Sequence, residues 1–280
     1  MTLATLAQVL QPAMRDGYAV AGLVTLGWED MRAYVRAAED EAVPVILQAG
    51  PTCRAHTPLA VLGKMFRHLA EGASVPVVAH LDHGYTLEEC REALDAGFTS
   101  LMFDGSRKSL SQNIEETAAI AEMAHGAGIS CEGEIGFVGY DRGEGSRGTN
   151  PEEAARFSRE TGVDAMAISV GNVHLMEDQG GGLDEGLIAE IEAATDIPLV
   201  IHGGSGVPVR QRSKLARETA ICKFNIGTEL RAVFGRSLRA ALAADTQSFD
   251  RVAILKETEA PIRDAARAAL RSLRPGSESP

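Results

Sequence analysis

The sequence predicts an α/β protein of the (β/α)8, or TIM-barrel, class. Eight apolar runs of strand character alternate regularly with helix-like stretches over about 250 residues, which matches the number of units in that barrel. Several runs are almost continuously hydrophobic, such as VPVIL and PLVI, as expected of parallel strands buried on both faces. No G-x-G-x-x-G motif follows the first strand, which favours a closed barrel over an open, doubly wound sheet. We therefore expect residues 1–280 to form one barrel domain.

The expected strands alternate with stretches of helical spacing rich in Ala, Glu and Arg, such as Leu87–Ala96 and Leu110–Ala127. A short amphipathic helix is predicted over residues 1–17, ahead of the first strand. A helical extension is predicted after the last strand, and residues 274–280 are expected to be a disordered tail. The strands themselves are predicted at Tyr18–Thr25, Val43–Ala49, Val75–Asp82, Ser100–Gly105, Ile129–Gly136, Ala165–Asn172, Pro198–Gly204 and Ile221–Gly227.

The composition argues against several classes of protein. The formal net charge is −12 and no basic stripe stands out, so nucleic acid is not an expected partner. The four cysteines are scattered without a C-x-x-C pair, which argues against a disulfide framework and against a cysteine zinc site. No apolar span approaches the roughly 20 residues that cross a membrane, and the amino terminus lacks the features of a signal peptide. A cytoplasmic protein without a membrane partner is expected.

Polar residues follow the apolar runs at the carboxyl ends of the predicted strands, where a barrel of this class builds its active site. Three histidines at three strand ends suit a catalytic zinc ion, which keeps one coordination position open beside three protein ligands. The glycine-rich turn after the seventh strand, just ahead of a helix, suits an anion such as phosphate. The residues are Asp82 and His83 in HLDHG, Asp104 in MFDGS, Glu132 and Glu134 in EGEIG, His174 in VGNVH, His202 in PLVIHGGSG, and Asn225, Gly227 and Thr228 in KFNIGTEL.

Each of these residues also has a structural interpretation. Asp82 and Asp104 could cap helices, and Asn225 could satisfy a turn. Glu132 and Glu134 alternate with apolar residues and so point to one side; if that side is the barrel interior, they need a cation as partner. The remaining histidines are interpreted as structural: His56, His68, His80 and His125.

Taken in order, HLDHG, LMFDGS, EGEIG, LVIHGGSG and KFNIGTEL resemble the signature segments of the class II, zinc-dependent ketose-bisphosphate aldolases, which include the fructose- and tagatose-bisphosphate aldolases. The resemblance runs from about Tyr18 to Leu230. It implies one catalytic Zn²⁺ per chain, held by His83, His174 and His202. It also implies that Asp82 is the general acid/base at the hydroxyl next to the breaking C–C bond.

The same resemblance assigns supporting roles. Asp104 and Glu134 would hold the ion, or a second divalent ion, in an alternative position, and a monovalent cation could lie near the donor phosphate. Asn225 would bind near the enediolate of the donor fragment. The donor phosphate would be held by Gly203, Ser205, Gly227 and Thr228.

The chain departs from the family pattern around the substrate. Leu175 stands where the family usually has glycine after the sixth-strand histidine, and Val24 and Gly27 replace two asparagines on the substrate side. A family arginine that reaches the far phosphate of a neighbouring subunit's substrate has only Arg251 as a loose match. The metal and acid/base residues match the family, whereas the residues around the phosphate differ.

The longest irregular segment, Phe137–Asn150, is rich in Gly and charge, which is typical of a lid or binding loop. We expect it to close over the site and to supply a second proton-transfer group, for which Glu144 is the candidate. Lys223 is expected to lie off the face of its strand that carries Asn225, which argues against a Schiff-base lysine.

The function predicted from these features is reversible retro-aldol cleavage of a ketose (bis)phosphate or a related hydroxy-ketone, by a homodimer or homotetramer. Three alternatives stay open. The first is a divergent family member acting on a non-standard, unphosphorylated donor. The second is a metal-dependent hydrolase on the same barrel, although the first strand lacks the usual H-x-H. The third is a non-catalytic, metal-bearing partner subunit.

Overall fold

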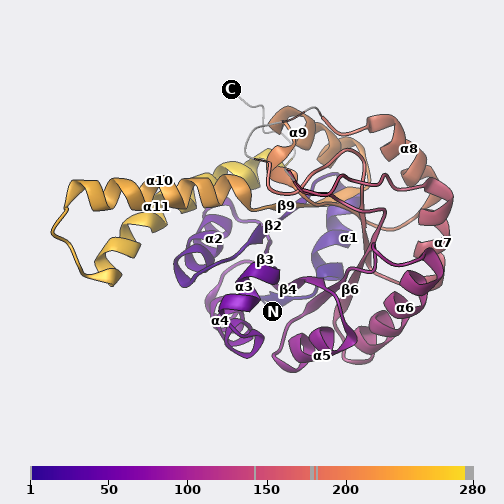
Figure 1. Cartoon of the computed structure of the whole chain (residues 1–280), viewed down its shortest axis with the longest axis horizontal. Helices are drawn as coiled ribbons and strands as arrows, with labels where there is room; N and C mark the ends of the chain where they lie inside the picture. Colours follow the sequence, from indigo (N-terminus) through magenta and orange to yellow (C-terminus); the bar gives the residue numbers. More distant parts are fainter. Residues whose placement is uncertain (1, 142, 177–179, 181, 275–280) are drawn as a thin grey trace.

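The computed structural model describes residues 2–141, 143–176, 180 and 182–274. Eight parallel strands close into a barrel, because each pairs with the next along the chain and the last pairs with the first (Figure 1). They are β2 (Val20–Val24), β3 (Val45–Ala49), β4 (Val77–Gly84), β5 (Ser100–Phe103), β6 (Ser130–Ile135), β7 (Ala165–Ile168), β8 (Leu199–Ile201) and β9 (Ile221–Ile226). Each overlaps one predicted run, and the predicted (β/α)8 barrel is confirmed.

Helices surround the barrel and pack their apolar faces onto the outside of the strands. Large side chains fill this layer, among them the fully buried Phe66, Phe103 and Phe224. The helices after β2 to β8 are α2 (Trp28–Glu41), α3 (Pro51–His56), α4 (Leu59–Gly72), α5 (Leu87–Asp95), α6 (Leu110–Gly126), α7 (Pro151–Thr161), α8 (Glu185–Ala194) and α9 (Val209–Glu218). A 3-10 turn, η1 (Gly204–Gly206), separates β8 from α9.

The amino-terminal segment closes one end of the barrel. Helix α1 (Leu6–Asp16) begins at a capping box in which Thr5 and Gln8 exchange hydrogen bonds. Its residues Leu6 and Leu10 pack in one cluster with residues of the strands that face the barrel interior, including Val78 and Val200. Strand β1 (Leu3–Ala4), which the sequence did not predict, pairs with β4. Since α1 covers the amino-terminal end, the opposite end is left for the site.

The last two helices, α10 (Thr228–Ala244) and α11 (Arg251–Ser272), form a hairpin that projects beyond the barrel (Figure 1). The returning half of α11 packs on α2, where Arg267 and Arg271 pair with Glu41 at 2.7 and 2.8 Å. The predicted disordered tail lies almost entirely outside the described residues. Among those described, no helix combines the length and the apolar character needed to cross a membrane.

Candidate active site

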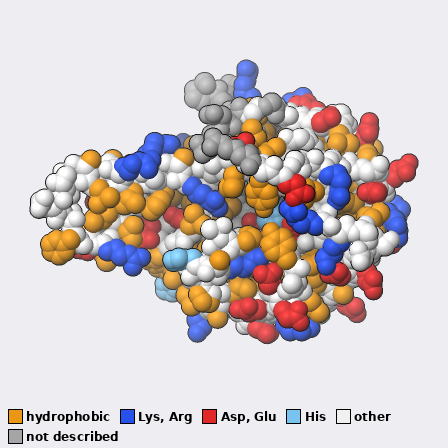
Figure 2. Space-filling model, viewed as in Figure 1, with side chains coloured by type: hydrophobic (Ala, Val, Ile, Leu, Met, Phe, Trp, Pro, Cys, Tyr) orange, Lys and Arg blue, Asp and Glu red, His pale blue; other side chains and the backbone are white. Residues whose placement is uncertain are grey.

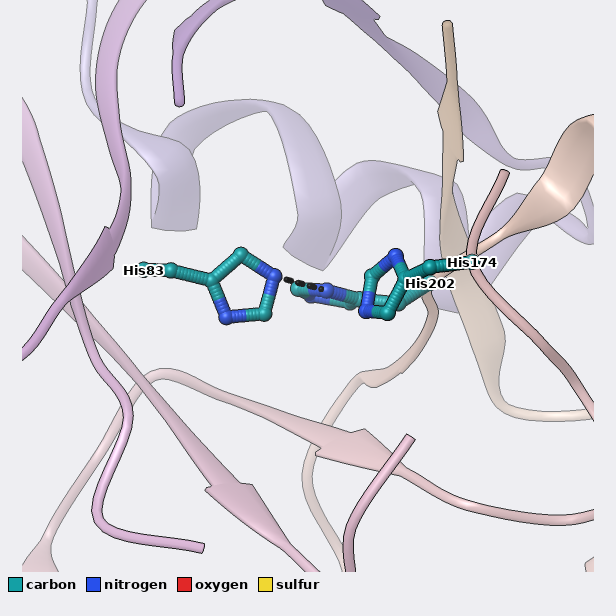
Figure 3. Close-up of side chains that lie close together, drawn as sticks. All are labelled: His83, His174 and His202. Carbon is teal, nitrogen blue, oxygen red and sulfur yellow. Dashed lines mark hydrogen bonds between the residues drawn. The ribbon is translucent and has the colours of Figure 1, made fainter. Parts of the chain in front are cut away.

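Three histidines converge at the carboxyl-terminal end of the barrel (Figure 3). His83 lies near the end of β4, His202 directly follows β8, and His174 lies in the loop after β7. One ring nitrogen of each lies within 4.8 Å of those of the other two. His83 adopts a left-handed backbone conformation, with φ of +54°, which Arg54 supports by donating hydrogen bonds to the carbonyls of Asp82 and His83.

Two carboxylates determine which nitrogens of these rings carry a proton. His202 Nε2 lies 3.1 Å from Glu132 Oε1, and His83 Nδ1 lies 2.9 Å from Asp104 Oδ2. Because an ionised carboxylate only accepts hydrogen bonds, both of these nitrogens must be the donors. In neutral rings the opposite nitrogens, His202 Nδ1 and His83 Nε2, therefore carry lone pairs.

Those two nitrogens point at each other across 2.9 Å, and His174 Nε2 is buried without a hydrogen-bond partner among the described residues. Facing lone pairs require a cation between them. Without a metal, that cation is a proton: burial opposes it, but Asp82, Asp104 and Glu134 together raise the pKa of His83 to about 9. These nitrogens thus fit a divalent metal ion, which neutral imidazoles would hold while the carboxylates behind them orient the rings.

A second group of candidate ligands shares His83. Ligand atoms of His83, Asp104 and Glu134 all lie within 4.8 Å of one another. Glu134 is almost fully buried, its Oε2 has no hydrogen-bond partner among the described residues, and burial together with Asp104 raises its pKa to about 8. Its Oε1 accepts a hydrogen bond from the Val138 amide, and its Oε2 lies 3.7 Å from His83 Nδ1, so this oxygen fits a second position for a cation.

Asp82 lies beside the histidines, where its Oδ1 accepts a hydrogen bond of 3.2 Å from the side-chain amide of Asn225. Burial alone would raise the pKa of Asp82, but the positive charges of His83 and Lys223 lower it overall, so the carboxylate is ionised. Neither Asp82 nor Asp104 caps a helix: the caps of α5 and α6 are Thr86 and Ser109.

The expectation for Lys223 is wrong. Residues 223 and 225 are two apart, so both side chains lie on the same side of β9, and Lys223 is fully buried inside the barrel. Its Nζ lies 2.6 Å from Glu132 Oε2 and 3.2 Å from His80 Nε2, beneath the metal-site histidines. The ion pair with Lys223 compensates for the burial of the Glu132 carboxylate, which orients His202.

The turn after His202 and the start of α10 lie side by side, where the sequence predicts an anion site. Gly203 has φ of +65°, and a Cβ there would lie 2.2 Å from the carbonyl oxygen of Val173, so only glycine fits. The Ser205 hydroxyl accepts hydrogen bonds from the amides of Gly227 and Glu229. Its own proton is then available to an anion above the first turn of α10, where Thr228 stands.

These groups line one cavity of about 200 Å³, and Asp82, His83, His174, Gly203, Ser205, Asn225, Gly227 and Thr228 all border it. Leu175 and Val24 border it as well, so two of the three departures from the family pattern reach the site; Gly27 does not. Leu175 has φ of +61°, a left-handed conformation in which glycine is favoured, and is 47% exposed.

His202, Asp104 and Glu134 lie behind this cavity beside His83, whereas two predicted residues belong neither to the cavity wall nor to the candidate ligand groups. Glu144 points away from the cavity and pairs with Arg107 at 2.6 Å on the surface, because the segment 137–147 folds back on itself through Phe137 and Arg147. Residue 142 of this loop lies outside the described residues. Arg251 borders a neighbouring cavity instead of the metal site.

Two tyrosines in the cavity wall were not predicted. Tyr140, from the irregular loop, stacks on the His174 ring at a centroid distance of 5.0 Å, and Tyr85 follows the HLDHG segment. The loop therefore contributes Tyr140 to the site, and not Glu144. The only signal for Tyr140 in the sequence was a tyrosine in the glycine-rich and charged part of this loop.

The family model described as "Fructose-bisphosphate aldolase class-II" matches residues 4–276. The chain belongs to the class II fructose-bisphosphate aldolase family. It is 35% identical over 275 residues to a fructose-bisphosphate aldolase of Geobacillus stearothermophilus, with 96% of this chain and 94% of that protein covered. It is also 35% identical over 265 residues to a 6-phospho-5-dehydro-2-deoxy-D-gluconate aldolase of Shouchella clausii, covering 92% and 89% of the two chains.

A solved structure supports the same family assignment. The crystal structure of the YdjI aldolase from Escherichia coli K12 matches with a TM-score of 0.84 and 28% identity, over 99% of this chain and 98% of that one. The resemblance predicted from the five sequence segments is confirmed, and the chain is an aldolase, a lyase of class II. Membership of this class implies a divalent metal, for which the three converging histidines are the candidate ligands.

Proposed function

We propose that this aldolase uses one zinc ion, held by His83, His174 and His202, to cleave a ketose phosphate into two carbonyl fragments. The observation that carries the proposal is the pair of facing nitrogens of His83 and His202, whose outer nitrogens are engaged by Asp104 and Glu132. Nitrogen lone pairs held this way select a cation of the zinc type. Asp104 and Glu134 would offer the second position.

When bound, the metal supplies a positive charge close to the carbonyl oxygen of the substrate, which gains negative charge as the C–C bond breaks. Asp82 would take the proton from the hydroxyl on the carbon beside that bond. The electron pair of the broken bond passes to the donor fragment, and the hydroxyl carbon leaves as an aldehyde. Asn225, hydrogen-bonded to Asp82, would hold both the carboxylate and the donor oxygen in place.

The donor fragment would place its anionic end on the amides around Gly203, Ser205 and Thr228. The relatives bear names for different aldol substrates, so family membership leaves the substrate open. Leu175 fills space in the cavity wall that glycine would leave open to a phosphate, and Val24 stands there in place of a polar asparagine side chain. We propose a donor end that is less polar than dihydroxyacetone phosphate, or shaped differently, with fructose 1,6-bisphosphate as a weak substrate.

Replacing Leu175 with glycine is expected to raise activity on fructose 1,6-bisphosphate and to stabilise the fold. Glycine occupies the left-handed conformation without the strain that leucine carries there, a difference of about 1 kcal/mol. It also opens the cavity to a phosphate, and one regained charge-assisted hydrogen bond would raise kcat/KM by roughly 10- to 100-fold. Steady-state kinetics and thermal melting measure the two effects. A wild-type kcat/KM above about 10⁵ M⁻¹s⁻¹, ordinary for an enzyme's own substrate, would contradict the proposal.

We also propose that the chain assembles as a homodimer or homotetramer through the α10–α11 hairpin. Hydrophobic side chains gather along this hairpin in Figure 2, and Phe249 and Val252 are 95% and 75% exposed. Burial of these groups against a second copy would remove them from water. Replacing Phe249 with serine is expected to lower the mass measured by light scattering, whereas Leu87→Ser, on α5, should leave it unchanged. A wild-type monomer would refute the assembly.

The proposed function is tested by measuring metal content together with retro-aldol activity over phosphorylated and unphosphorylated ketoses. We expect about one zinc per chain and cleavage of at least one ketose phosphate. Cleavage only of unphosphorylated ketoses would favour the divergent alternative. Full metal content without any lyase activity would favour the partner-subunit alternative, and ester hydrolysis would favour the metal-dependent hydrolase.

A further inference from the structure

Arg231 stands between two cavities. It lies one helical turn after Thr228 on α10 and borders both the metal-site cavity and a neighbouring cavity of about 530 Å³. The second cavity is lined mainly by apolar side chains of α2, α4 and the α10–α11 hairpin, including Trp28, Leu62 and Phe234. A group that extends from the metal site into the second cavity therefore passes the guanidinium of Arg231.

The guanidinium of Arg231 is not fully hydrogen-bonded by the described residues. Its Nε is buried without a hydrogen bond, and within the described part of the chain no carboxylate forms an ion pair with it. The neighbouring Arg212 is paired with Glu229 at 2.8 Å. Leaving a partly buried guanidinium unpaired is costly, so its position suits an anion that arrives with a ligand.

Asp30 lines the same second cavity, and its carboxylate is already hydrogen-bonded to the backbone. Asp30 accepts hydrogen bonds from the amides of Leu26 and Gly27 at 3.0 and 3.1 Å. Burial raises the pKa of Asp30 and of the Cys53 thiol, and the positive charge of Arg231 partly offsets that rise in both. Arg231 lines the second cavity together with Asp30 and the metal-site cavity together with Cys53, which places it on the β2–β3 side, whereas Gly203 and Ser205 follow β8. The two anion-binding ends of the cavity are therefore distinct.

We propose that Arg231 binds an anionic group, phosphate or carboxylate, at the far end of the substrate's aldehyde fragment, with the second cavity accommodating the chain around it. The inference rests on the proposed retro-aldol function. A planar guanidinium recognises either anion by paired hydrogen bonds, and the apolar cavity beyond it admits a longer chain than a compact phosphate site would. Arg231 is thus a specificity-determining residue.

The kinetic test compares substrates that differ only at the far end: fructose 1-phosphate, fructose 1,6-bisphosphate and the 6-carboxylate analogue of fructose 1-phosphate. Arg231→Met is expected to lower kcat/KM by about 10- to 100-fold on the anionic substrate that the wild type prefers, and by less than about threefold on fructose 1-phosphate. Arg231→Lys should retain part of the preference. The matched control, Arg236→Gln, changes an exposed arginine of the same helix that lines neither cavity.

A preference for phosphate or for carboxylate identifies the anion. Equal losses on the substrate with a neutral far end and on those with an anionic far end would overturn the inference, as would no loss on any of them. Either result would leave the aldolase proposal intact.

A second readout needs neither metal nor turnover. Trp28 is the only tryptophan in the chain and borders the second cavity. Titrating metal-free protein with glycerol 3-phosphate or glycerate is expected to change its fluorescence saturably, whereas glycerol should not. The change should be lost in Arg231→Met and kept in Arg236→Gln. An unaltered response in Arg231→Met, with both variants folded by circular dichroism, would refute the anion site even if no aldol substrate were found.

Discussion

Replacing His202 with alanine is expected to remove the bound metal and to lower retro-aldol activity by about 10³-fold or more. Two remaining histidines leave an incomplete ligand set, and the loss of a Lewis acid removes several kcal/mol of stabilisation from the transition state. Plasma emission spectrometry gives the metal content, and a coupled assay gives the rate. His68→Ala is the matched control, since His68 is exposed on α4 and belongs neither to the candidate ligand groups nor to the lining of the site cavity. Retention of both metal and rate in His202→Ala would eliminate this ligand assignment.

The same ligand set predicts how metal binding depends on pH. In the metal-free protein His83 has a pKa of about 9, because the surrounding carboxylates outweigh the effect of burial. Below that pH a metal ion must displace the proton, so the apparent affinity should rise about tenfold per pH unit and level off near pH 9. Competition with a chelator at several pH values measures the slope. A flat profile between pH 6 and 8 would mean that no proton is displaced.

Replacing Asp82 with alanine is expected to lower kcat by roughly 10²- to 10⁴-fold, the usual contribution of a general acid/base, while the metal stays bound. The reason is positional: Asp82 lies in the cavity wall and hydrogen-bonds Asn225, but it belongs to neither group of candidate metal ligands. Asp82→Asn keeps the shape and removes only the charge, so it should lose nearly as much activity. Zinc loss in step with activity in both variants would instead place Asp82 among the ligands.

Much of the architecture could be predicted from local sequence. Apolar runs buried on both faces, each followed by an amphipathic stretch, specify β/α units, and eight of them close a barrel. Because all parallel strands of a closed barrel end at the same edge, polar residues after the strands had to meet there. His83, His174 and His202 were found this way, with Asp82, Asp104 and Glu134 beside them.

The residues that were wrongly predicted or missed all depend on contacts with residues far away in the sequence. Glu144 was a reasonable candidate in a polar loop, but its partner Arg107 is 37 residues away in the sequence, and that pairing turns it outward. Tyr140 lines the site only because its loop folds against His174. Lys223 was assigned to the wrong face of its strand. The structure shows that its side chain lies inside the barrel and pairs with Glu132, 91 residues earlier.

The sequence by itself determined the barrel, the edge at which the chemistry lies and the kinds of ligand gathered there, because strand periodicity and strand ends are local properties. Tertiary structure alone decided which nitrogens of His83 and His202 face each other, since Asp104 and Glu132 approach those rings from other strands. It also decided that Arg231 stands between two cavities, with its buried Nε unbonded by any of the described residues. Contacts of this kind depend on which side chains packing brings together across the barrel, and no pattern along the chain specifies them.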